Sequence, residues 1–523
     1  MASTAPILVA GTWRPPCVAG TYRAVDPATG SDREEIWPVS DWRDVDVALD
    51  AATAAARELA GLPGHRLAAF LERYAARLEA RAGDLVAVAH AETGLPVKPR
   101  LADVEMPRTL DQLRQAAASA REGTWRMAMI DHAKNIRACA TGLGPVVVFP
   151  PANFPFAYGA VTGGDFAAAI AAGNPVIAKA HPGHPSVSRL AAAEAVGALA
   201  DTGLPPATVQ LVHGLEPAVG ERLVADPRVG ATGFTGSQAA GEKLFRAATA
   251  AGRVIWVEMG SVNPVVLLPG ALAERGSAIA DELTASVTGS AGQFCTKPGV
   301  VFLVGDDAGR GFTQTLAGKF AAIGPQVLLG PAGCDRLVAS IRGLEAAGAR
   351  ILAGGAAAAG PASHVPTLLE VSGQELLARP DALVVEAFGN ATVLVVCATL
   401  DELLRAVACV HGSLGASLYA ATDGRDDAAF AALVPLVIDR AGRVIENRMP
   451  TGLAVVPAMQ HGGPWPSAGP PFFSAVGFPW TMLRFARRVC YDGWTESRLP
   501  EIVRDAPPEG RPWRYVDHAW TRG

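Results

Sequence analysis

The stretch that decides the fold runs from Pro145 to Met259, where five short apolar segments alternate with helical patterns. The segments are PVVVF (145–149), NPVIAKA (174–180), TVQLVH (208–213), VGATGF (229–234) and RVIWVEM (253–259). Helical patterns cover residues 159–172, 186–202, 216–225 and 237–251, with Ser186 as an expected N-cap. Such alternation predicts βαβ units and a parallel sheet covered by helices on both faces. We therefore predict an α/β fold with a doubly wound, Rossmann-type sheet.

A second series of similar segments lies downstream. It consists of PVVLL (264–268), a helical stretch over 271–288, VVFLV (300–304), VLVVC (393–397) and a helix over 400–409. These segments predict a second α/β domain. The first 120 residues are expected to be mostly helical, over 41–60, 66–93 and 102–120, and the Gly-Ala stretch 354–360 is expected to be a loop. The proline-containing tail from Leu499 is expected to be an extended arm that packs on the body or on a partner subunit.

The composition excludes several functional classes. The length of 523 residues suggests about three domains. Hydrophobic residues make up 50% of the chain, which argues against disorder, and a net charge of −5 argues against nucleic-acid binding. Prolines interrupt the apolar stretch 138–164, so we expect no membrane span there, and the N-terminus lacks the basic region of a signal peptide. Seven cysteines without a CxxC pair indicate the reducing cytoplasm.

Three polar side chains lie at predicted strand ends or turns and have catalytic chemistry. Cys295, in AGQFCTKPG, occupies a turn where a thiol becomes a nucleophile only if a base or a positive potential ionises it. Glu258 ends VIWVEM and is a candidate general base. Asn153, in PPANFPF, is a candidate donor to an oxyanion. The ordinary alternatives are a buried thiol, a carboxylate that caps a turn and an asparagine in a proline-rich turn.

Two further features suggest a ligand that carries phosphate. GFTGS (233–237) follows a strand and opens a helix, where backbone N–H groups bind phosphate, although such turns are common. Lys179 ends the strand NPVIAKA, where its ammonium either reaches ribose or phosphate or is simply solvated. His181 and His184 have an HxxH spacing, but Pro182 and Pro185 break any helix there and no third ligand is near. We therefore expect no metal site.

Together these motifs resemble those of the aldehyde dehydrogenase superfamily over essentially the whole chain. The motifs in order are NFP at Asn153, the strand-end Lys179, FTGS at Phe234, VEMGSVNP at Glu258, GQFCT at Cys295 and EAFG at Glu386. Further details resemble one branch, the 2,5-dioxopentanoate (α-ketoglutarate semialdehyde) dehydrogenases and the related NADP-dependent fatty aldehyde dehydrogenases. These details are GGD (163–165), KAHPGHP (179–185), CTKPG (295–299), HGGPWP (461–466) and GRPWRYVDH (510–518).

The resemblance implies the oxidation of an aldehyde to a carboxylate with NADP or NAD. Cys295 would form a thiohemiacetal, the Asn153 amide and the Cys295 backbone N–H would hold its oxyanion, and Glu258 would activate water to hydrolyse the thioester. The implied cofactor-binding residues are Phe149, Lys179, His181, His184, Gly233, Gly236, Ser237, Glu386 and Phe388. The implied substrate-binding residues are Arg108, Phe154, Phe156 and Phe294, with Tyr158 beside them.

Two positions depart from the family pattern. Asn390 stands where the family usually has the Pro of FGP, which is expected to loosen the loop without removing the Glu386 contact. Pro182 stands where NAD-preferring members have a Glu that binds the adenosine 2′-hydroxyl. Without a carboxylate to repel a 2′-phosphate, we predict a preference for NADP or use of both cofactors, with His181, His184 or Ser188 near the phosphate.

The substrate is predicted from the arginines of RTLDQLR. Arg108 is the candidate partner for the carboxylate of a semialdehyde, whereas the alternative for Arg108 and Arg114 is a surface or interdomain salt bridge. The aromatic residues would also suit a medium- or long-chain aliphatic aldehyde. A catalytically silent relative that keeps the fold is the alternative of a different class, and the presence of Cys295, Glu258 and Asn153 argues against it.

The resemblance also divides the chain into domains. Residues 1–124 and 144–258 would form the cofactor-binding domain and 259–446 the catalytic domain, with 447–479 as a return segment to the cofactor domain. Residues 125–143 and 480–523 would form a small β oligomerisation element and C-terminal arm. The implied partners are a small-molecule aldehyde and further copies of the chain, in a homodimer or homotetramer.

Overall fold

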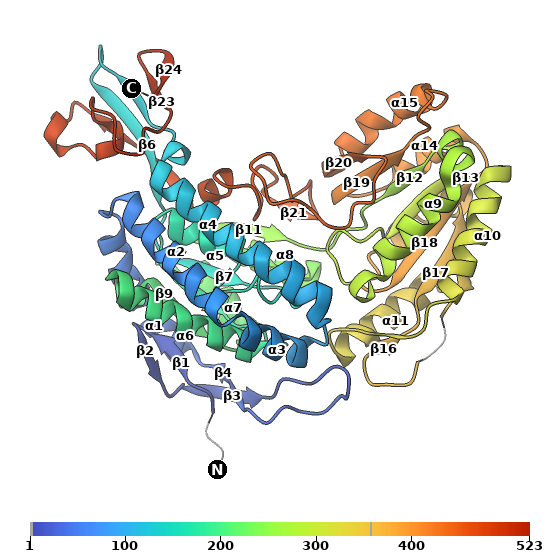
Figure 1. Ribbon diagram of the computed structural model, residues 1–523, viewed down its shortest axis with the longest axis horizontal. Helices are drawn as coiled ribbons and strands as arrows, with labels where there is room; N and C mark the ends of the chain where they lie inside the picture. The colour runs from blue at the N-terminus through green and yellow to red at the C-terminus, as the bar shows by residue number, and fades with distance from the viewer. Residues whose placement is uncertain (1–3, 356–357, 523) are drawn as a thin grey trace.

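An eight-stranded sheet forms the core of the lobe that contains the N-terminal half of the chain (Figure 1). The computed structural model describes residues 4–355 and 358–522. The strands lie in the order β2 (Thr12–Arg14), β1 (Ile7–Val9), β9 (Val209–Val212), β8 (Val176–Lys179), β7 (Val146–Phe149), β10 (Ala231–Thr235), β11 (Val254–Glu258) and β21 (Ala468–Gly469). From β9 to β11 the strands are parallel, and the outer pairings are antiparallel. Starting from the central strand β7, the chain adds β8 and β9 on one side and then returns to add β10 and β11 on the other. The predicted doubly wound sheet is confirmed.

Helices cover both faces of this sheet. They are α1 (Trp42–Leu59), α2 (Gly64–Ala80), α3 (Ala82–Thr93), α4 (Met106–Glu122), α5 (Gly164–Ala171), α6 (Pro185–Thr202), α7 (Pro217–Ala225) and α8 (Gln238–Ala250). The single helix expected over 66–93 is two helices, and a π-helical segment over Val97–Glu105 precedes α4. The strands β1 and β2, and the pair β3 (Val18–Tyr22) and β4 (Trp37–Ser40), were not predicted. Their short mixed sequences lack the long apolar runs of the central strands.

The expected N-cap of α6 is wrong. The helix begins at Pro185 after His184, and the backbone N–H groups of Ser186 and Val187 donate to the carboxylate of Glu92 at 3.0 and 3.2 Å. Glu92 lies in the last turn of α3, so a carboxylate from another helix satisfies the first turn of α6, and the Ser186 side chain is not needed there. Burial raises the pKa of Glu92 to about 7.

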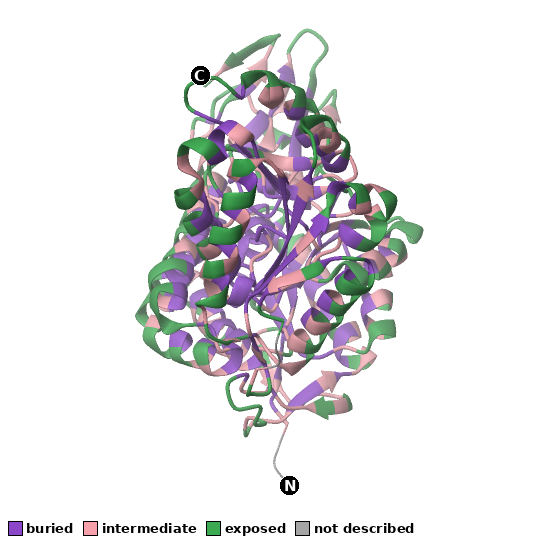
Figure 2. Ribbon diagram, turned by 90° about the vertical axis from the view of Figure 1, so that its right-hand side faces the viewer, coloured by how far each residue is buried: buried purple, intermediate pink, exposed green. Residues whose placement is uncertain are grey.

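A seven-stranded sheet forms the second lobe. Its order is β15 (Arg350–Ala353), β17 (Thr367–Ser372), β18 (Ala391–Cys397), β13 (Val300–Val304), β12 (Val265–Leu267), β19 (Ser413–Tyr419) and β20 (Ala441–Glu446), and all pairings except β15 with β17 are parallel. Its helices include α9 (Pro269–Thr288), α10 (Asp307–Ala321), α11 (Pro331–Ala346), α14 (Leu400–Val407) and α15 (Asp427–Ile438), with the shorter α12 (Gly373–Ala378) and α13 (Pro380–Leu383) beside them. Figure 2 shows buried strands between helices whose outer faces are exposed. The predicted α/β character of this region is confirmed.

A five-stranded sheet projects from one end of the first lobe (Figure 1). Its order is β22 (Ala486–Asp492), β6 (Ile136–Gly142), β5 (Met129–Asp131), β23 (Arg514–Val516) and β24 (Ala519–Thr521). The tail that was expected to be an extended arm therefore supplies strands that pair with residues far away in the sequence. Residues 356–357, within the expected loop 354–360, lie outside the described part of the chain. Among the described residues, no helix is both long and apolar enough to cross a membrane.

The parallel register brings several strand ends to one edge of the first sheet. Phe149, Lys179 and Glu258 are the last residues of β7, β8 and β11, and GFTGS spans the end of β10 and the turn after it. A buried ion pair between Asp165 of α5 and Arg484 fixes the sheet beneath this edge. Gly233 of β10 lies under Asp165, and a Cβ at this position would collide with its carboxylate. Ligands bind at this edge in open α/β sheets, so the fold itself locates the candidate site.

Candidate active site

The loop that carries Cys295 connects α9 to β13 and has a strained backbone. Ser290 and Ala291 have left-handed φ angles of 48° and 54°, which residues with a Cβ rarely adopt. At Gly292, with φ 69°, a Cβ would collide with the carbonyl oxygen of Gly389. Only glycine fits this contact, which packs the Cys295 loop directly against the loop that carries Glu386.

Two buried side chains tie these loops together. Asn263 Nδ2 donates to the carbonyl oxygens of Cys295 at 2.8 Å and Lys297 at 3.0 Å. Lys297 is 2% exposed, and its Nζ donates to the carbonyl oxygens of Ala387 at 3.0 Å and Ala391 at 2.6 Å. Burial lowers the pKa of Lys297 to about 8. The loops around Cys295 and Glu386 therefore form one rigid unit.

The Glu386 loop is also fixed at its far end. Glu386 accepts a hydrogen bond from the backbone N–H of Ser261 at 3.2 Å, and burial raises the pKa of Glu386. Asn390 is fully buried, donates to Gln326 Oε1 at 2.9 Å and to the carbonyl oxygen of His364 at 3.1 Å, and lies 2.8 Å from His364 Nδ1. The expectation that Asn390 loosens this loop is wrong, because its amide joins the loop to two neighbouring segments.

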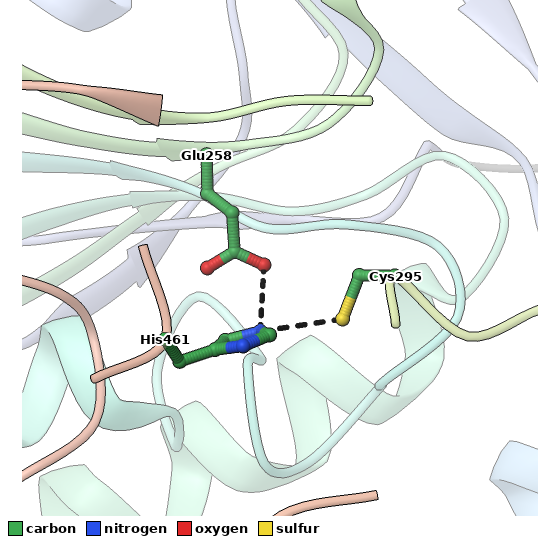
Figure 3. A group of neighbouring side chains, drawn as sticks. All are labelled: Glu258, Cys295 and His461. Carbon is green, nitrogen blue, oxygen red and sulfur yellow. Dashed lines mark hydrogen bonds and ion pairs between the residues drawn. The ribbon is translucent and has the colours of Figure 1, made fainter. Parts of the chain in front are cut away.

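The imidazole of His461 lies between Cys295 and Glu258 (Figure 3). Its Nε2 is 3.3 Å from Cys295 Sγ and 3.0 Å from Glu258 Oε1. His461 is 1% exposed and Glu258 6%, whereas Cys295 is half-buried. Burial by itself lowers the pKa of His461, but the charges of Glu258 and Cys295 raise it to about 10. A histidine directly beside the sulfur is the environment in which a cysteine becomes a nucleophile.

Asn153 reaches the same loop from the end of β7. Its Nδ2 donates to the carbonyl oxygen of Gln293 at 2.9 Å, and the side chain is buried. Arg100 donates to the backbone carbonyl oxygen of Asn153 at 2.8 Å and pairs with Glu105. This hydrogen bond holds the Asn153 amide against the backbone of Gln293, which is two residues before Cys295 in the sequence.

The predicted substrate residues divide into two groups. Phe154, Tyr158 and Phe294 form an aromatic cluster, with the ring of Phe154 5.4 Å from that of Tyr158 and 5.9 Å from that of Phe294. Phe156 lies instead in the main core of the first lobe and is 1% exposed.

The two candidate arginines also differ in their surroundings. The Arg108 guanidinium lies 5.7 Å from the ring centre of Phe154 and 5.3 Å from that of Tyr158, and its Nη2 is 3.3 Å from Tyr158 Oη. Among the described residues, Arg108 has no carboxylate within ion-pair distance. Arg114 forms an exposed ion pair with Glu79 at 2.6 Å, away from the aromatic cluster.

The predicted cofactor residues follow the edge of the first sheet. Burial lowers the pKa of Lys179 to about 8. His184 is fully buried, its Nε2 lies 3.0 Å from the carbonyl oxygen of Pro151, and its ring stacks on that of His181. Ser188 is 3% exposed, whereas His181 is half-buried. Of the three residues expected near a 2′-phosphate, only His181 keeps appreciable surface.

The turn after β10 is open to a ligand. Ser237 is the exposed N-cap of α8, and its side chain caps none of the helix N–H groups. Phe149 and Phe234 pack beneath the turn with ring centres 6.3 Å apart. A Cβ at Gly236 would lie 2.8 Å from the Phe234 ring. Free N–H groups at the start of α8 suit a phosphate, and Phe388 is half-buried in the Glu386 loop on the other side.

The model of the aldehyde dehydrogenase family matches residues 13–468. The chain belongs to this family. The alpha-ketoglutaric semialdehyde dehydrogenase 2 of Azospirillum brasilense is 39% identical over 94% of each chain, and the alpha-ketoglutaric semialdehyde dehydrogenase of Acinetobacter baylyi is 34% identical over 89% of each. Among solved structures, a mutant of aldehyde dehydrogenase C from Pseudomonas syringae with NAD⁺ and octanal has a TM-score of 0.81 at 21% identity, covering 95% of this chain and 98% of that one. As a member of the family, the protein oxidises aldehydes with NAD(P)⁺.

His461, in HGGPWP, has a place in the site that the sequence did not predict. It lies 166 residues from Cys295, in the segment between β20 and β21 that has no regular secondary structure. The short antiparallel strand β21 pairs Ala468 with Glu258 and so returns this segment to the end of β11. A two-residue strand has no periodicity to predict. The only signal was a histidine between proline-rich and glycine-rich stretches in a region without secondary structure.

The His461 contact predicts how fast Cys295 reacts. We expect His461→Asn to slow the alkylation of Cys295 by iodoacetamide at pH 7 by about tenfold or more, because an unassisted thiol is only a few per cent ionised there. The two rates should converge toward pH 10, where the imidazolium loses its proton and a free thiol is ionised. Peptide-resolved mass spectrometry gives both rates, with the exposed Cys490 as the internal control. Equal rates at pH 7 would show that His461 does not activate the sulfur.

Proposed function

We propose that this chain oxidises an acidic semialdehyde of the α-ketoglutaric semialdehyde type with NADP⁺, through a thioester on Cys295. The contact of His461 with both Cys295 and Glu258 is the observation that carries the catalytic assignment. The names of the relatives at 39% and 34% identity support the substrate class. The guanidinium of Arg108 supports it independently, because it lies beside the aromatic cluster and, among the described residues, bonds only to the neutral Gln112 and Tyr158 and to no carboxylate.

The first half of the reaction uses Cys295 and Asn153. The thiolate of Cys295 attacks the aldehyde carbon and forms a thiohemiacetal. The oxyanion accepts hydrogen bonds from the Asn153 amide and the backbone N–H of Cys295, each of which contributes about 3 kcal/mol in comparable sites. His461 Nε2, 3.3 Å from the sulfur, is placed to take the thiol proton before the attack. When bound, NADP⁺ accepts the hydride that leaves this carbon, and a thioester remains on Cys295.

The second half uses Glu258. Its carboxylate takes a proton from a water molecule, and the hydroxide formed attacks the thioester carbon and releases the acid and the thiolate. Oε1 lies 3.0 Å from His461 Nε2, and within the described residues Oε2 has no hydrogen-bond partner, so Oε2 is available to water. A buried general base of this kind contributes about 10²–10⁴-fold in rate.

The edge of the first sheet fits the cofactor. The backbone N–H groups of the first turn of α8, beside Gly236 and Ser237, would hold the pyrophosphate, and Lys179 and Glu386 would hold the riboses. Phe388 would pack against the nicotinamide, and Phe149 and Gly233 would lie beneath the bound cofactor. His181 would contact the 2′-phosphate while the buried His184 holds its ring in place.

We further propose that the three large sheets correspond to cofactor-binding, catalytic and oligomerisation domains, with the boundaries predicted from the sequence. Trp520 of β24 is exposed, as are Trp494 just after β22 and Trp513 just before β23, which supports burial in a dimer or tetramer. The seven free thiols, of which Cys295 must stay reduced to react, support a cytoplasmic location.

Replacement of Glu258 separates the two halves of the reaction. We expect Glu258→Gln to give one rapid equivalent of NADPH followed by turnover that is slower by about 10²–10⁴-fold, because hydride transfer does not need the carboxylate. Rapid mixing with absorbance detection of NADPH measures both phases. Glu446→Gln, an exposed glutamate in β20, is the matched control. Steady turnover at the wild-type rate would remove Glu258 from the mechanism.

The position of Pro182 predicts the cofactor. We expect kcat/KM for NADP⁺ to equal or exceed that for NAD⁺ in the wild type. In Pro182→Glu we expect the ratio of kcat/KM for NADP⁺ to kcat/KM for NAD⁺ to fall by about tenfold or more, because the new carboxylate repels a 2′-phosphate. Pro182→Gln, which adds the same bulk without charge, controls for the loss of the proline. A tenfold preference of the wild type for NAD⁺ would contradict the assignment.

Arg108 tests the substrate class. We expect Arg108→Gln to lower kcat/KM for α-ketoglutaric semialdehyde by about ten- to a hundredfold, because a charge-assisted hydrogen bond is lost. Octanal, which has no carboxylate, should be nearly unaffected, and Arg114→Gln should leave both substrates unchanged. An equal loss for both aldehydes would favour an aliphatic aldehyde as the substrate and a structural role for Arg108.

A further inference from the structure

We propose that Cys295, His461 and Glu258 also form an inhibitory site for a divalent transition-metal ion such as Zn²⁺, which closes the active site reversibly. This inference rests on the proposed function, because the ion binds the sulfur that attacks the aldehyde. It also departs from the sequence-based expectation of no metal site, which considered the histidines at 181 and 184 but not the one at 461.

The ligand set is the first argument. Cysteine thiolate, imidazole nitrogen and carboxylate oxygen are the three donors that bind zinc in proteins, and sites with three protein ligands keep a fourth position open to water. The three donor atoms here all lie within 4.8 Å of one another. They come from three distant parts of the chain: the end of β11, the loop before β13 and the segment before β21 (Figure 3).

The distances are the second argument. With a Zn–S bond of about 2.3 Å and Zn–N and Zn–O bonds of about 2.0–2.1 Å, tetrahedral angles place S and N about 3.6 Å apart and N and O about 3.3 Å apart. The observed separations are 3.3 Å between Cys295 Sγ and His461 Nε2 and 3.0 Å between His461 Nε2 and Glu258 Oε1. These two pairs therefore need to move apart by only a few tenths of an ångström, while Cys295 Sγ and the Glu258 oxygen, which lie within 4.8 Å of each other, need a separation of about 3.6 Å.

The carboxylate of Glu258 is an independent sign of a ligand. The residue is 6% exposed and its Oε1 lies 3.0 Å from His461 Nε2, but within the described part of the chain its Oε2 has no hydrogen-bond donor. Buried carboxylates are normally paired with donors or with metals, since burying one without partners is costly. In the proposed reaction a water molecule fills this place, and a bound ion would displace that water or take it as its fourth ligand.

The binding step exchanges a proton for the ion and involves no electron transfer. Cys295 Sγ and His461 Nε2 share one proton, either on the sulfur or on the nitrogen, and both atoms must release it to bind the metal. One proton therefore leaves for each ion bound, and the apparent affinity rises with pH. The bound sulfur has its lone pair on the metal and no longer attacks an aldehyde, so inhibition follows from the same geometry as catalysis.

Cobalt(II) reports on this site without any turnover. We expect the reduced full-length wild-type protein to bind one Co²⁺ at this site. The expected signals are a thiolate-to-cobalt charge-transfer band in the near ultraviolet and visible bands typical of tetrahedral cobalt, and Zn²⁺ should remove both. The same Zn²⁺ concentration range should inhibit NADPH formation, and EDTA should restore it.

Two variants locate the ion. His461→Gln should weaken Co²⁺ binding at least about 100-fold, since even the loss of outer-shell partners costs 10- to 100-fold. Cys409→Ser, which removes a half-buried thiol elsewhere, should leave the charge-transfer band unchanged. Circular dichroism and NADP⁺ binding verify that both variants are folded.

The absence of a charge-transfer band in the wild type, or a band that survives His461→Gln, would overturn the proposed site. Loss of the band in Cys409→Ser would overturn it as well. These outcomes are independent of the proposed function. A protein that shows the cobalt band but oxidises no aldehyde refutes the function alone, and an active enzyme without the band refutes the metal site alone.

Discussion

The buried contact of His461 with Cys295 and Glu258 is the interaction on which the active site depends. Each residue comes from a different part of the fold: Glu258 from the edge of the eight-stranded sheet, Cys295 from the loop that enters the seven-stranded sheet, and His461 from the segment that returns between them. The contact exists only when both large sheets and the return segment are correctly placed. The fold therefore assembles the nucleophile and its activating group together.

Electrostatics explains why such an arrangement is tolerated. A buried carboxylate is unfavourable on its own, and so is a buried imidazolium. At 3.0 Å they offset each other, and the charges of Glu258 and Cys295 raise the pKa of His461 to about 10. The sulfur therefore lies beside an imidazole that readily holds a proton. The same three groups are reactive because they are poorly satisfied by the rest of the protein.

Much of the fold could be predicted from the sequence, because the central strands are short apolar runs between alanine-rich helices. The ends of β7, β8 and β11 followed directly, and with them the positions of Phe149, Lys179 and Glu258 at one edge. Local signals were weaker elsewhere. The N-terminal strands and the two-residue β21 have no pattern long enough to read, and the cap of α6 comes from Glu92 on another helix. His461 was missed for the same reason, since its role comes from tertiary placement and not from spacing in the sequence.

Lys297 and Asn390 show how a departure from the family pattern is compensated. Where the family has a proline to stiffen the loop after Glu386, this chain has a fully buried amide that bonds to Gln326 and His364. Lys297 holds the same loop from the other side through the carbonyl oxygens of Ala387 and Ala391. Because Lys297 is two residues from Cys295, one side chain fixes the Glu386 loop relative to the Cys295 loop. Hydride transfer needs the reacting atoms to be aligned closely, so in the proposed reaction the hydrogen bonds that replace the proline would also set the distance between cofactor and thiol.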